Sequence, residues 1–287
     1  MLTTVSQTRS FPITERVALI TGANTGIGRI TALELARQGY HVFLAGRSLE
    51  RTRSVLAEIS TSCAAGVAEW LPLDLADFAS VRACAQSFLT RNLDLHLLVN
   101  NAGLAGAGGL TQSGFEMAFG VNHMGHFLLT QLLLDRLRQS APARVVTVAS
   151  RAHARVSAID WDAVRRPGNT LLNAKEYCVS KLANVIFSAE LGCRLRGSGV
   201  STYSLHPGVI GSDLWRDLPW PLRSLSRLLM SSPEEGAKTT MHCCLSTVVA
   251  NETGLYYSDC RPKLPSAAAQ DSSLAEALWR HSDDWIR

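Results

Sequence analysis

Short apolar runs alternate with longer amphipathic stretches along the chain. The apolar runs predict buried strands over 16–21, 41–45, 67–73, 95–100, 144–149 and 200–205. The stretches between them carry apolar residues at helical spacing and predict helices over 27–38, 49–59, 78–89, 115–139 and 175–196. Strands that are apolar throughout and separated by helices indicate a parallel sheet covered on both faces. We therefore predict one α/β domain, a Rossmann-type doubly wound parallel sheet of about seven strands, over residues 1–287.

Two stretches interrupt this alternation. Residues 151–173 are polar and loop-like, and residues 211–232 mix bulky apolar side chains with Pro219 and Pro221. Both follow the carboxyl end of a predicted strand, where doubly wound sheets bind ligands. We interpret 211–232 as a substrate lid. The alternatives are a surface helix packed on the core, or contact of its amphipathic part with a membrane surface.

Composition narrows the class of protein. The chain has 287 residues, of which 46% are hydrophobic and 18% charged, enough for a folded core without staples. Its 28 basic and 24 acidic residues are scattered, which argues against a nucleic-acid interface. The seven cysteines include no CxxC pair and favour a reducing compartment. We see no signal peptide and no run long enough to cross a bilayer, and we expect a cytoplasmic protein.

A glycine-rich turn, TGANTGIG, joins the first predicted strand to the first helix. Its glycines follow the spacing GxxxGxG and let the backbone approach a ligand closely, while the helix N-terminus presents free N–H groups to a pyrophosphate. This pattern predicts a dinucleotide site. The contacts that we expect from this turn are Gly22, Asn24, Thr25, Gly26, Ile27 and Gly28.

The end of the second strand indicates which dinucleotide binds. Proteins that bind NAD usually place an acid there, whereas this chain has Arg47. An arginine can pair with the 2′-phosphate of NADP through charge-assisted hydrogen bonds, so we favour NADP(H) over NAD(H). Arg29 could add to this positive field, or could be an ordinary solvated helix residue.

Two further strand ends face the same groove. Asp74 ends the third strand and could bind the adenine amine, or could cap the next helix. The run NNAG ends the fourth strand, and its small residues would let the backbone approach the adenosine; the alternative is an ordinary strand-ending turn. The predicted contacts here are Asp74, Asn101, Ala102 and Gly103.

Tyr177 and Lys181 are four residues apart in a predicted helix and so face the same side. A tyrosine that exchanges a proton near neutral pH needs its pKa lowered from about 10 by about two to three units, roughly 3–4 kcal/mol. A nearby ammonium and the positive ring of an oxidised nicotinamide could together lower the pKa by this much. The alternative is a solvent-facing pair. Lys181 could also bind the nicotinamide ribose.

Ser150 ends the fifth strand, where its hydroxyl could hold a substrate carbonyl oxygen, although serine at a strand end is more often a cap or turn residue. Asn122 falls in the middle of a predicted helix, an unusual place for asparagine. It could be exposed, or could bond backbone or water inside the site.

Histidines could suggest a metal centre. His123 and His126 are three residues apart but have no acidic neighbour, so we predict no metal site. His153 and His206 we interpret as packing or loop residues rather than bases.

Together these motifs resemble the short-chain dehydrogenase/reductase superfamily, over about 16–279, and within it the retinol dehydrogenase-type group. The motifs that carry the resemblance are TGANTGIGR, AGRS, LDLADFASVR, LLVNNAG, GFEMAFGVNHMGHFLLT, YCVSKLANVIF, HPGVIGSDL, SPEEGAK and GLYYSDCRP. The resemblance implies that Tyr177 is the general acid/base, that Lys181 lowers its pKa and holds the ribose, and that Ser150 orients the substrate oxygen.

It also implies that Asn122 anchors a water in a proton relay through Lys181. Pro207 and Gly208 would border the nicotinamide, and Ser212 would bind its carboxamide, where the family commonly has threonine.

Three positions differ from the pattern of the group. Ala149 replaces a second serine and should be harmless because Ser150 remains. Gly46 replaces a common cysteine, so Arg47 should be held less rigidly. Ser212 keeps a hydroxyl but lacks the methyl of threonine. Animal retinoid enzymes often carry an N-terminal membrane anchor, and we expect none here. We therefore expect an apolar aldehyde or ketone, rather than a retinoid in particular, as the substrate.

We therefore predict an NADP(H)-dependent oxidoreductase that interconverts an apolar aldehyde or ketone and its alcohol, with carbonyl reduction as the direction in cells. The alternatives are a tailoring ketoreductase of secondary metabolism and a non-catalytic NADP-binding sensor. Members of the family often pair through long helices, so the resemblance implies a homodimer or a homotetramer as the alternatives for assembly.

Overall fold

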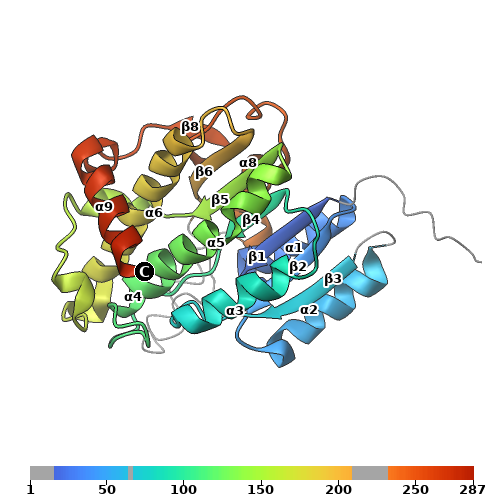
Figure 1. The fold of residues 1–287 in the computed structure, drawn as a ribbon, viewed down its shortest axis with the longest axis horizontal. Helices are drawn as coiled ribbons and strands as arrows, with labels where there is room; N and C mark the ends of the chain where they lie inside the picture. Colours follow the sequence, from blue (N-terminus) through green and yellow to red (C-terminus); the bar gives the residue numbers. More distant parts are fainter. Residues whose placement is uncertain (1–15, 64–66, 209–231) are drawn as a thin grey trace, which may run out of the picture.

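The computed structural model describes residues 16–63, 67–208 and 232–287. An eight-stranded sheet runs through the molecule in the order β3-β2-β1-β4-β5-β6-β7-β8 (Figure 1). All neighbouring strands are parallel except β7 and β8, which are antiparallel. The strands are β1 Val17–Thr21, β2 His41–Gly46, β3 Val67–Pro72, β4 Leu97–Asn100, β5 Ala143–Val148, β6 Val200–His206, β7 Leu255–Ser258 and β8 Arg261–Lys263. The predicted doubly wound, Rossmann-type single domain is confirmed.

Helices cover both faces of this sheet (Figure 1). The main helices are α1 Gly26–Arg37, α2 Leu49–Ser62, α3 Phe78–Leu89, α5 Gly125–Gln139, α6 Ala174–Arg194, α8 Pro233–Leu245 and α9 Ser272–Trp285. Shorter pieces are α4 Met117–Phe119, the π-helical turn η1 Gly120–Met124, and the 3₁₀ turns η2 Arg151–Arg155, η3 Ala163–Arg165, η4 Leu171–Asn173 and η6 Ala267–Gln270.

Successive side chains of the central strands point to opposite faces of the sheet, so the core lies in two layers. Ala18 and Ile20 of β1 point to the layer that contains α1, α2 and α8. Val17 and Leu19 of the same strand point to the layer that contains α3, α5 and α6. Because β1 is buried on both faces, its sequence is apolar without alternation, as parallel strands require.

The predicted helix over 115–139 is interrupted in the structure. It consists of α4, the π turn η1 and α5, and the N–H of Gly125 reaches back five residues to the carbonyl of Gly120. A Cβ at Gly120 would lie 2.4 Å from Cγ2 of Thr111, so close packing requires glycine where the π turn begins. The turn contains Asn122, and π turns frequently occur at functional sites.

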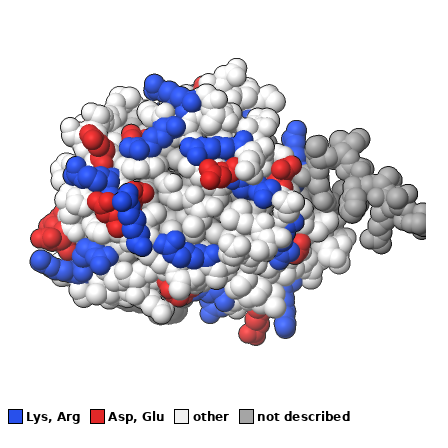
Figure 2. All heavy atoms as spheres, in the orientation of Figure 1, with Lys and Arg blue, Asp and Glu red and all other residues white. Residues whose placement is uncertain are grey.

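The C-terminal part of the chain adds β7, β8, α8 and α9, none of which the periodicity located individually. The predicted lid over 211–232 lies outside the described residues, apart from Ser232, whose hydroxyl accepts from the N–H of Glu235 at the start of α8. In the described ranges, no helix is both long and apolar enough to span a membrane. Figure 2 shows basic and acidic side chains intermingled on the face that it presents.

Candidate active site

A cavity of about 1140 Å³ opens at the carboxyl ends of the central strands, where the chain crosses from β3 to β4. All but one of the predicted site residues that the structure describes line this cavity. They are Gly22, Asn24, Thr25, Gly26, Ile27, Gly28, Arg47, Asp74, Asn101, Ala102, Gly103, Ser150, Tyr177, Lys181, Pro207 and Gly208. Asn122 lies behind the wall, and Ser212 lies outside the described residues. Topology thus brings together residues from six separate strand ends.

The glycine-rich turn has the shape of a phosphate cradle. Gly22 and Gly26 adopt positive φ angles of 67° and 56°, which favour glycine. A Cβ at Gly28 would lie 2.4 Å from the carbonyl oxygen of Gly22, so the helix could not pack against the turn with any larger residue. Thr25 precedes α1 as its N-cap and makes no side-chain capping hydrogen bond. The first N–H groups of α1 therefore face the cavity as an anion site that fits a pyrophosphate.

Thr21 connects this turn to the end of β4, a role that the sequence reasoning missed. Its Oγ1 accepts hydrogen bonds from the N–H groups of Asn101 and Ala102, both at 3.0 Å. The amide Nδ2 of Asn101 donates to the carbonyl oxygen of Thr21 at 2.8 Å. The side chain of Asn101 thus holds two strand ends together, and its backbone, with Ala102, forms the cavity wall.

His126 of α5 completes this network. Its Nδ1 lies 3.0 Å from the carbonyl oxygen of Asn122, which can only accept, so Nδ1 carries the proton. Its Nε2, 2.8 Å from Oγ1 of Thr21, is then the acceptor. Burial lowers the pKa of His126 to about 4, which keeps the ring neutral as this arrangement requires. The spacing of Asn122 and His126 at i and i+4 was the available signal in the sequence.

Arginines gather at the end of β2. Arg47 is exposed and lines the cavity together with Arg51 of α2. Asp74 also lines it, and its Oδ1 accepts from the N–H of Ala76 at 3.0 Å. The N-cap of α3 is Asp77, so the alternative that Asp74 caps that helix is wrong. Asp74 stands at the cavity edge as a half-buried carboxylate.

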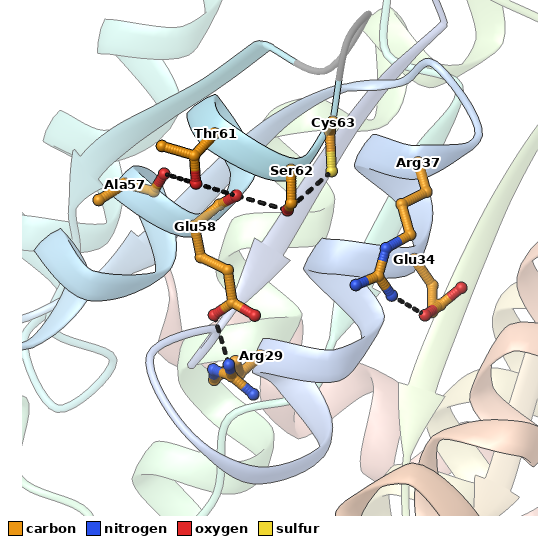
Figure 3. A network of polar contacts seen from close by, with 8 residues as sticks. All are labelled: Arg29, Glu34, Arg37, Ala57, Glu58, Thr61, Ser62 and Cys63. Atoms are coloured by element: carbon orange, nitrogen blue, oxygen red, sulfur yellow. Dashed lines mark hydrogen bonds and ion pairs between the residues drawn. The ribbon is translucent and has the colours of Figure 1, made fainter.

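Arg29 forms an ion pair outside the cavity. Its guanidinium pairs with the carboxylate of Glu58, which links α1 to α2 (Figure 3). Figure 3 also shows Arg37 turned toward Glu34 further along α1. Arg29 is absent from the described lining of the cavity. Its positive charge is therefore compensated, and the idea that it adds to the field around a 2′-phosphate receives no support.

Tyr177, Lys181 and Ser150 lie on one wall. Nζ of Lys181 donates to the carbonyl oxygen of Val148 at 2.9 Å and lies 5.8 Å from the centre of the Tyr177 ring. Burial lowers the pKa of Lys181 to about 8. Oγ of Ser150 accepts from the N–H of Ala152 at 3.2 Å and so caps η2 while it lines the cavity. The two interpretations of Ser150 are compatible.

The pKa of Tyr177 is shifted in the opposite direction from the one expected. Burial raises it above its usual value of 10, and a hydrogen bond with the side chain of Ser150 opposes this rise only in part. The expectation of a lowered pKa assumed the charge of a bound nicotinamide as well as that of Lys181. The side chains by themselves favour the neutral phenol.

Asn122 is fully buried and holds a loop. Its Oδ1 accepts from the N–H of Leu104 at 2.8 Å, and its Nδ2 donates to the carbonyl of Leu104 and to Oγ of Ser180. A Cβ at Gly103 would lie 3.2 Å from Oδ1 of Asn122 and 3.4 Å from Nζ of Lys181, so this glycine separates the two. Of the alternatives that the sequence left open, exposure to solvent is therefore wrong, and the amide bonds the backbone.

The other histidines have varied surroundings. Nε2 of His123 lies 3.0 Å from Oγ of Ser282, and burial lowers the pKa of His123 to about 3. His153 donates from Nδ1 to the carbonyl of Ser150, as a loop residue would. His206 lines the cavity. Within the described ranges, no three His, Cys, Asp or Glu side chains cluster so as to hold a metal ion.

The cradle, the strand-end arginine and the Tyr–Lys–Ser wall describe a nucleotide-dependent dehydrogenase, and comparison with known proteins agrees. The family model described as short chain dehydrogenase matches residues 16–163. The chain belongs to this family and is an oxidoreductase that acts on CH–OH groups with an NAD(P) nucleotide. The predicted resemblance is confirmed.

Individual relatives refine the picture. Human retinol dehydrogenase 11 is 42% identical over 291 residues, covering 100% of this chain and 90% of the relative. Human retinol dehydrogenase 12 is 43% identical over 93% of this chain and 85% of its own. A solved structure from Mycobacterium paratuberculosis has a TM-score of 0.77 at 32% identity, covering 95% of this chain and 94% of that one. The Pseudomonas aeruginosa RhlG/NADP complex has a TM-score of 0.66 at 28% identity, covering 85% and 94%.

Proposed function

We propose that the protein is an NADP(H)-dependent oxidoreductase that interconverts an apolar aldehyde or ketone and its alcohol. The observation that carries this proposal is the convergence of Ser150, Tyr177 and Lys181 on one wall of the cavity whose other end is the glycine-rich cradle. The names of the retinol dehydrogenase relatives support an apolar alcohol or aldehyde as substrate.

The preference for NADP rests on charge. Arg47 and Arg51 line the nucleotide end of the cavity, and Asp74 is the one acid among the described lining residues. Two guanidinium groups beside a strand end favour a ribose that carries a phosphate, because each can form charge-assisted hydrogen bonds to it. The Pseudomonas relative is an NADP complex, which supports the same choice.

Each active-site residue has a distinct part in the reaction. A nicotinamide nucleotide held by the glycine-rich cradle and Lys181 would supply or accept the hydride at the carbinol carbon and, when oxidised, would add a positive charge to the site. Tyr177 exchanges the proton at the substrate oxygen, and Ser150 donates a hydrogen bond to that oxygen. Lys181, held by Val148, keeps a positive charge beside the phenol and holds the ribose. Because burial alone raises the pKa of Tyr177, the phenol remains protonated and ready to donate to a carbonyl.

The buried amide of Asn122 fixes the loop at Leu104, which lines the cavity next to Gly103. We propose that Asn122 thereby positions the backbone beside Lys181, where the water of the implied proton relay would bind. Pro207, Gly208 and Ser212 remain the proposed partners of the nicotinamide.

A non-catalytic NADP sensor would not need Tyr177 and Lys181 on one wall with Ser150, and we therefore favour an enzyme. A tailoring ketoreductase uses the same chemistry with a different pocket and remains the second candidate. The seven cysteines, none of which is paired, support our proposal of a reducing, cytoplasmic location.

The experiment is to measure NADPH and NADH oxidation by the purified protein with apolar aldehydes and ketones, including retinal. We expect turnover with NADPH and a clear loss of kcat/KM with NADH. Equal or better use of NADH would contradict the NADP proposal. Absence of turnover with every carbonyl, while NADPH still binds, would favour the sensor.

A further inference from the structure

The described lining of the cavity is strongly positive at both ends. Five basic side chains line it against one acid, Asp74. Three of the five have a place in the proposed function: Arg47 and Arg51 at the nucleotide end, and Lys181 beside Tyr177. The remaining two, Arg151 and Arg155, lie at the first and last positions of η2, directly after Ser150.

The positive charges of Arg151 and Arg155 are not compensated by any acidic side chain among the described residues. Both are exposed, and among the described residues neither guanidinium has an ion pair or a hydrogen bond. Burial raises the pKa of Cys178, the neighbour of Tyr177, and the charge of Arg155 opposes this rise only in part. The charge of Arg151 acts on His206 and Tyr256. Both cations therefore stand around the Ser150–Tyr177 end of the cavity rather than around the cradle.

His206 is a second, independent observation at this end. It lines the cavity, is only 6% exposed, and within the described part of the chain neither of its ring nitrogens has a hydrogen-bond partner. A buried polar group without a partner is uncommon and calls for a ligand or a water. His153 nearby shows the ordinary case, because its Nδ1 bonds the carbonyl of Ser150 and its Nε2 accepts from the N–H of Ser266.

The interpretation of His206 as a packing residue is therefore incomplete. Burial and, to a lesser extent, the charge of Arg151 lower its pKa to about 4, while Asp259 opposes this shift from outside the described lining. The imidazole is neutral at physiological pH and offers one N–H donor. A neutral donor near two guanidinium groups that have no ion pair among the described residues is complementary to an anion.

We propose that Arg151, Arg155 and His206 form an anion site, and that the carbonyl substrate carries a carboxylate or a phosphate on an otherwise apolar chain. This inference rests on the proposed function and names its substrate class. Aldehyde or ketone reduction leaves the anionic group unchanged; the group only orients the chain with its carbonyl at Ser150 and Tyr177. The cofactor's own phosphates are accounted for at the opposite end by the cradle, Arg47 and Arg51.

The test uses three aldehydes of matched chain: 9-oxononanoate, 9-oxononyl phosphate and methyl 9-oxononanoate. With NADPH, we expect at least one anion to exceed the neutral ester in kcat/KM by about tenfold, the size of one or two screened ion pairs. The better of the two anions identifies carboxylate or phosphate as the group. An ester reduced as well as both anions would overturn the inference while leaving the proposed function intact. Failure of all three aldehydes, and of the apolar panel, would instead count against the proposed function.

Variants separate recognition from folding. In the double variant Arg151→Gln/Arg155→Gln, we expect the ratio of anion to ester to fall about tenfold, toward unity, with little change in kcat/KM for the ester. His206→Leu should lower the ratio, and His206→Gln, which keeps an N–H donor, should restore part of it. The matched control is Arg196→Gln, an exposed arginine beyond the end of α6, which should leave the ratio unchanged.

A binding measurement without turnover completes the test. Nonanedioate is not reducible by hydride transfer, and its Kd for the NADP⁺-loaded protein can be measured by calorimetry. We expect the double variant to weaken this Kd about tenfold while NADP⁺ binds as before. Equal losses for anion and ester, unchanged nonanedioate binding, or the same effect from Arg196→Gln would each overturn the anion site.

Discussion

Replacing Thr21 by valine removes one hydroxyl from the junction of β1 and β4 while nearly preserving its shape. The N–H of Asn101 would keep the carbonyl of Val99 as an acceptor at 3.0 Å. The N–H of Ala102 and Nε2 of His126 would lose the partner that they have in Thr21. Two polar groups are thus left without a hydrogen bond, one of them in a side chain that is fully buried.

An unsatisfied buried donor or acceptor costs about 1–3 kcal/mol, and the substitution leaves two such groups, so Thr21→Val should lower the free energy of unfolding by about 2–6 kcal/mol. Thr21→Ser is the matched control, because it keeps the hydroxyl and removes one methyl, at a cost of about 1 kcal/mol. Urea unfolding of the cofactor-free protein measures both. Since Asn101 and Ala102 line the cavity, Thr21→Val should also weaken NADPH binding, which fluorescence titration measures. If valine were no more destabilising than serine, the network around Thr21 would not stabilise this junction as described.

Three further predictions concern the cradle and the charges around it. Gly28→Ala should abolish NADPH binding or detach α1 from the sheet, because the new Cβ would lie 2.4 Å from the carbonyl oxygen of Gly22. Gly46→Ala is the control, because a Cβ there meets nothing within 4 Å. Tight NADPH binding by Gly28→Ala would contradict the proposed cradle. Arg47→Gln should raise the KM for NADPH about tenfold and leave the KM for NADH nearly unchanged. Equal rises of both KM values would contradict the proposed contact between Arg47 and the 2′-phosphate. Burial lowers the pKa of Lys181 from 10.5 to about 8, so between these pH values the unfolded chain binds more protons than the folded protein. The free energy of unfolding should therefore rise from pH 8 to pH 10, relative to that of the Lys181→Met variant. A fall over this range would contradict a buried lysine that is charged at lower pH.

Much of the fold could be read from local patterns. The run VALIT is apolar without alternation, which is typical of a parallel strand buried on both faces. Gly22, Gly26 and Gly28 were recognisable because the turn needs positive φ and close packing, which no other residue type supplies. Tyr177 and Lys181 were recognisable because i and i+4 positions share a helix face.

What the patterns missed depends on contacts between distant parts of the chain. The π turn at Asn122 follows from packing of Gly120 on Thr111, which helical periodicity does not reveal. The role of Thr21 arises from residues about 80 and 105 positions away, Asn101 and His126. The ring of His206 has no hydrogen-bond partner in the described part of the chain, which could be recognised only once its neighbours were known. The pKa of Tyr177 was expected to fall, and burial raises it, because desolvation is a property of the packed structure.

The central claim is that Tyr177 passes the proton in an NADPH-dependent carbonyl reduction. The most direct measurement is the rate of NADPH oxidation at saturating apolar aldehyde for the native protein and for Tyr177→Phe, with the Kd for NADPH determined in parallel. Loss of a general acid typically costs about 10²–10⁴-fold in rate. We predict a loss of this size with a nearly unchanged Kd for NADPH. A Tyr177→Phe variant that retains the native rate would contradict the account.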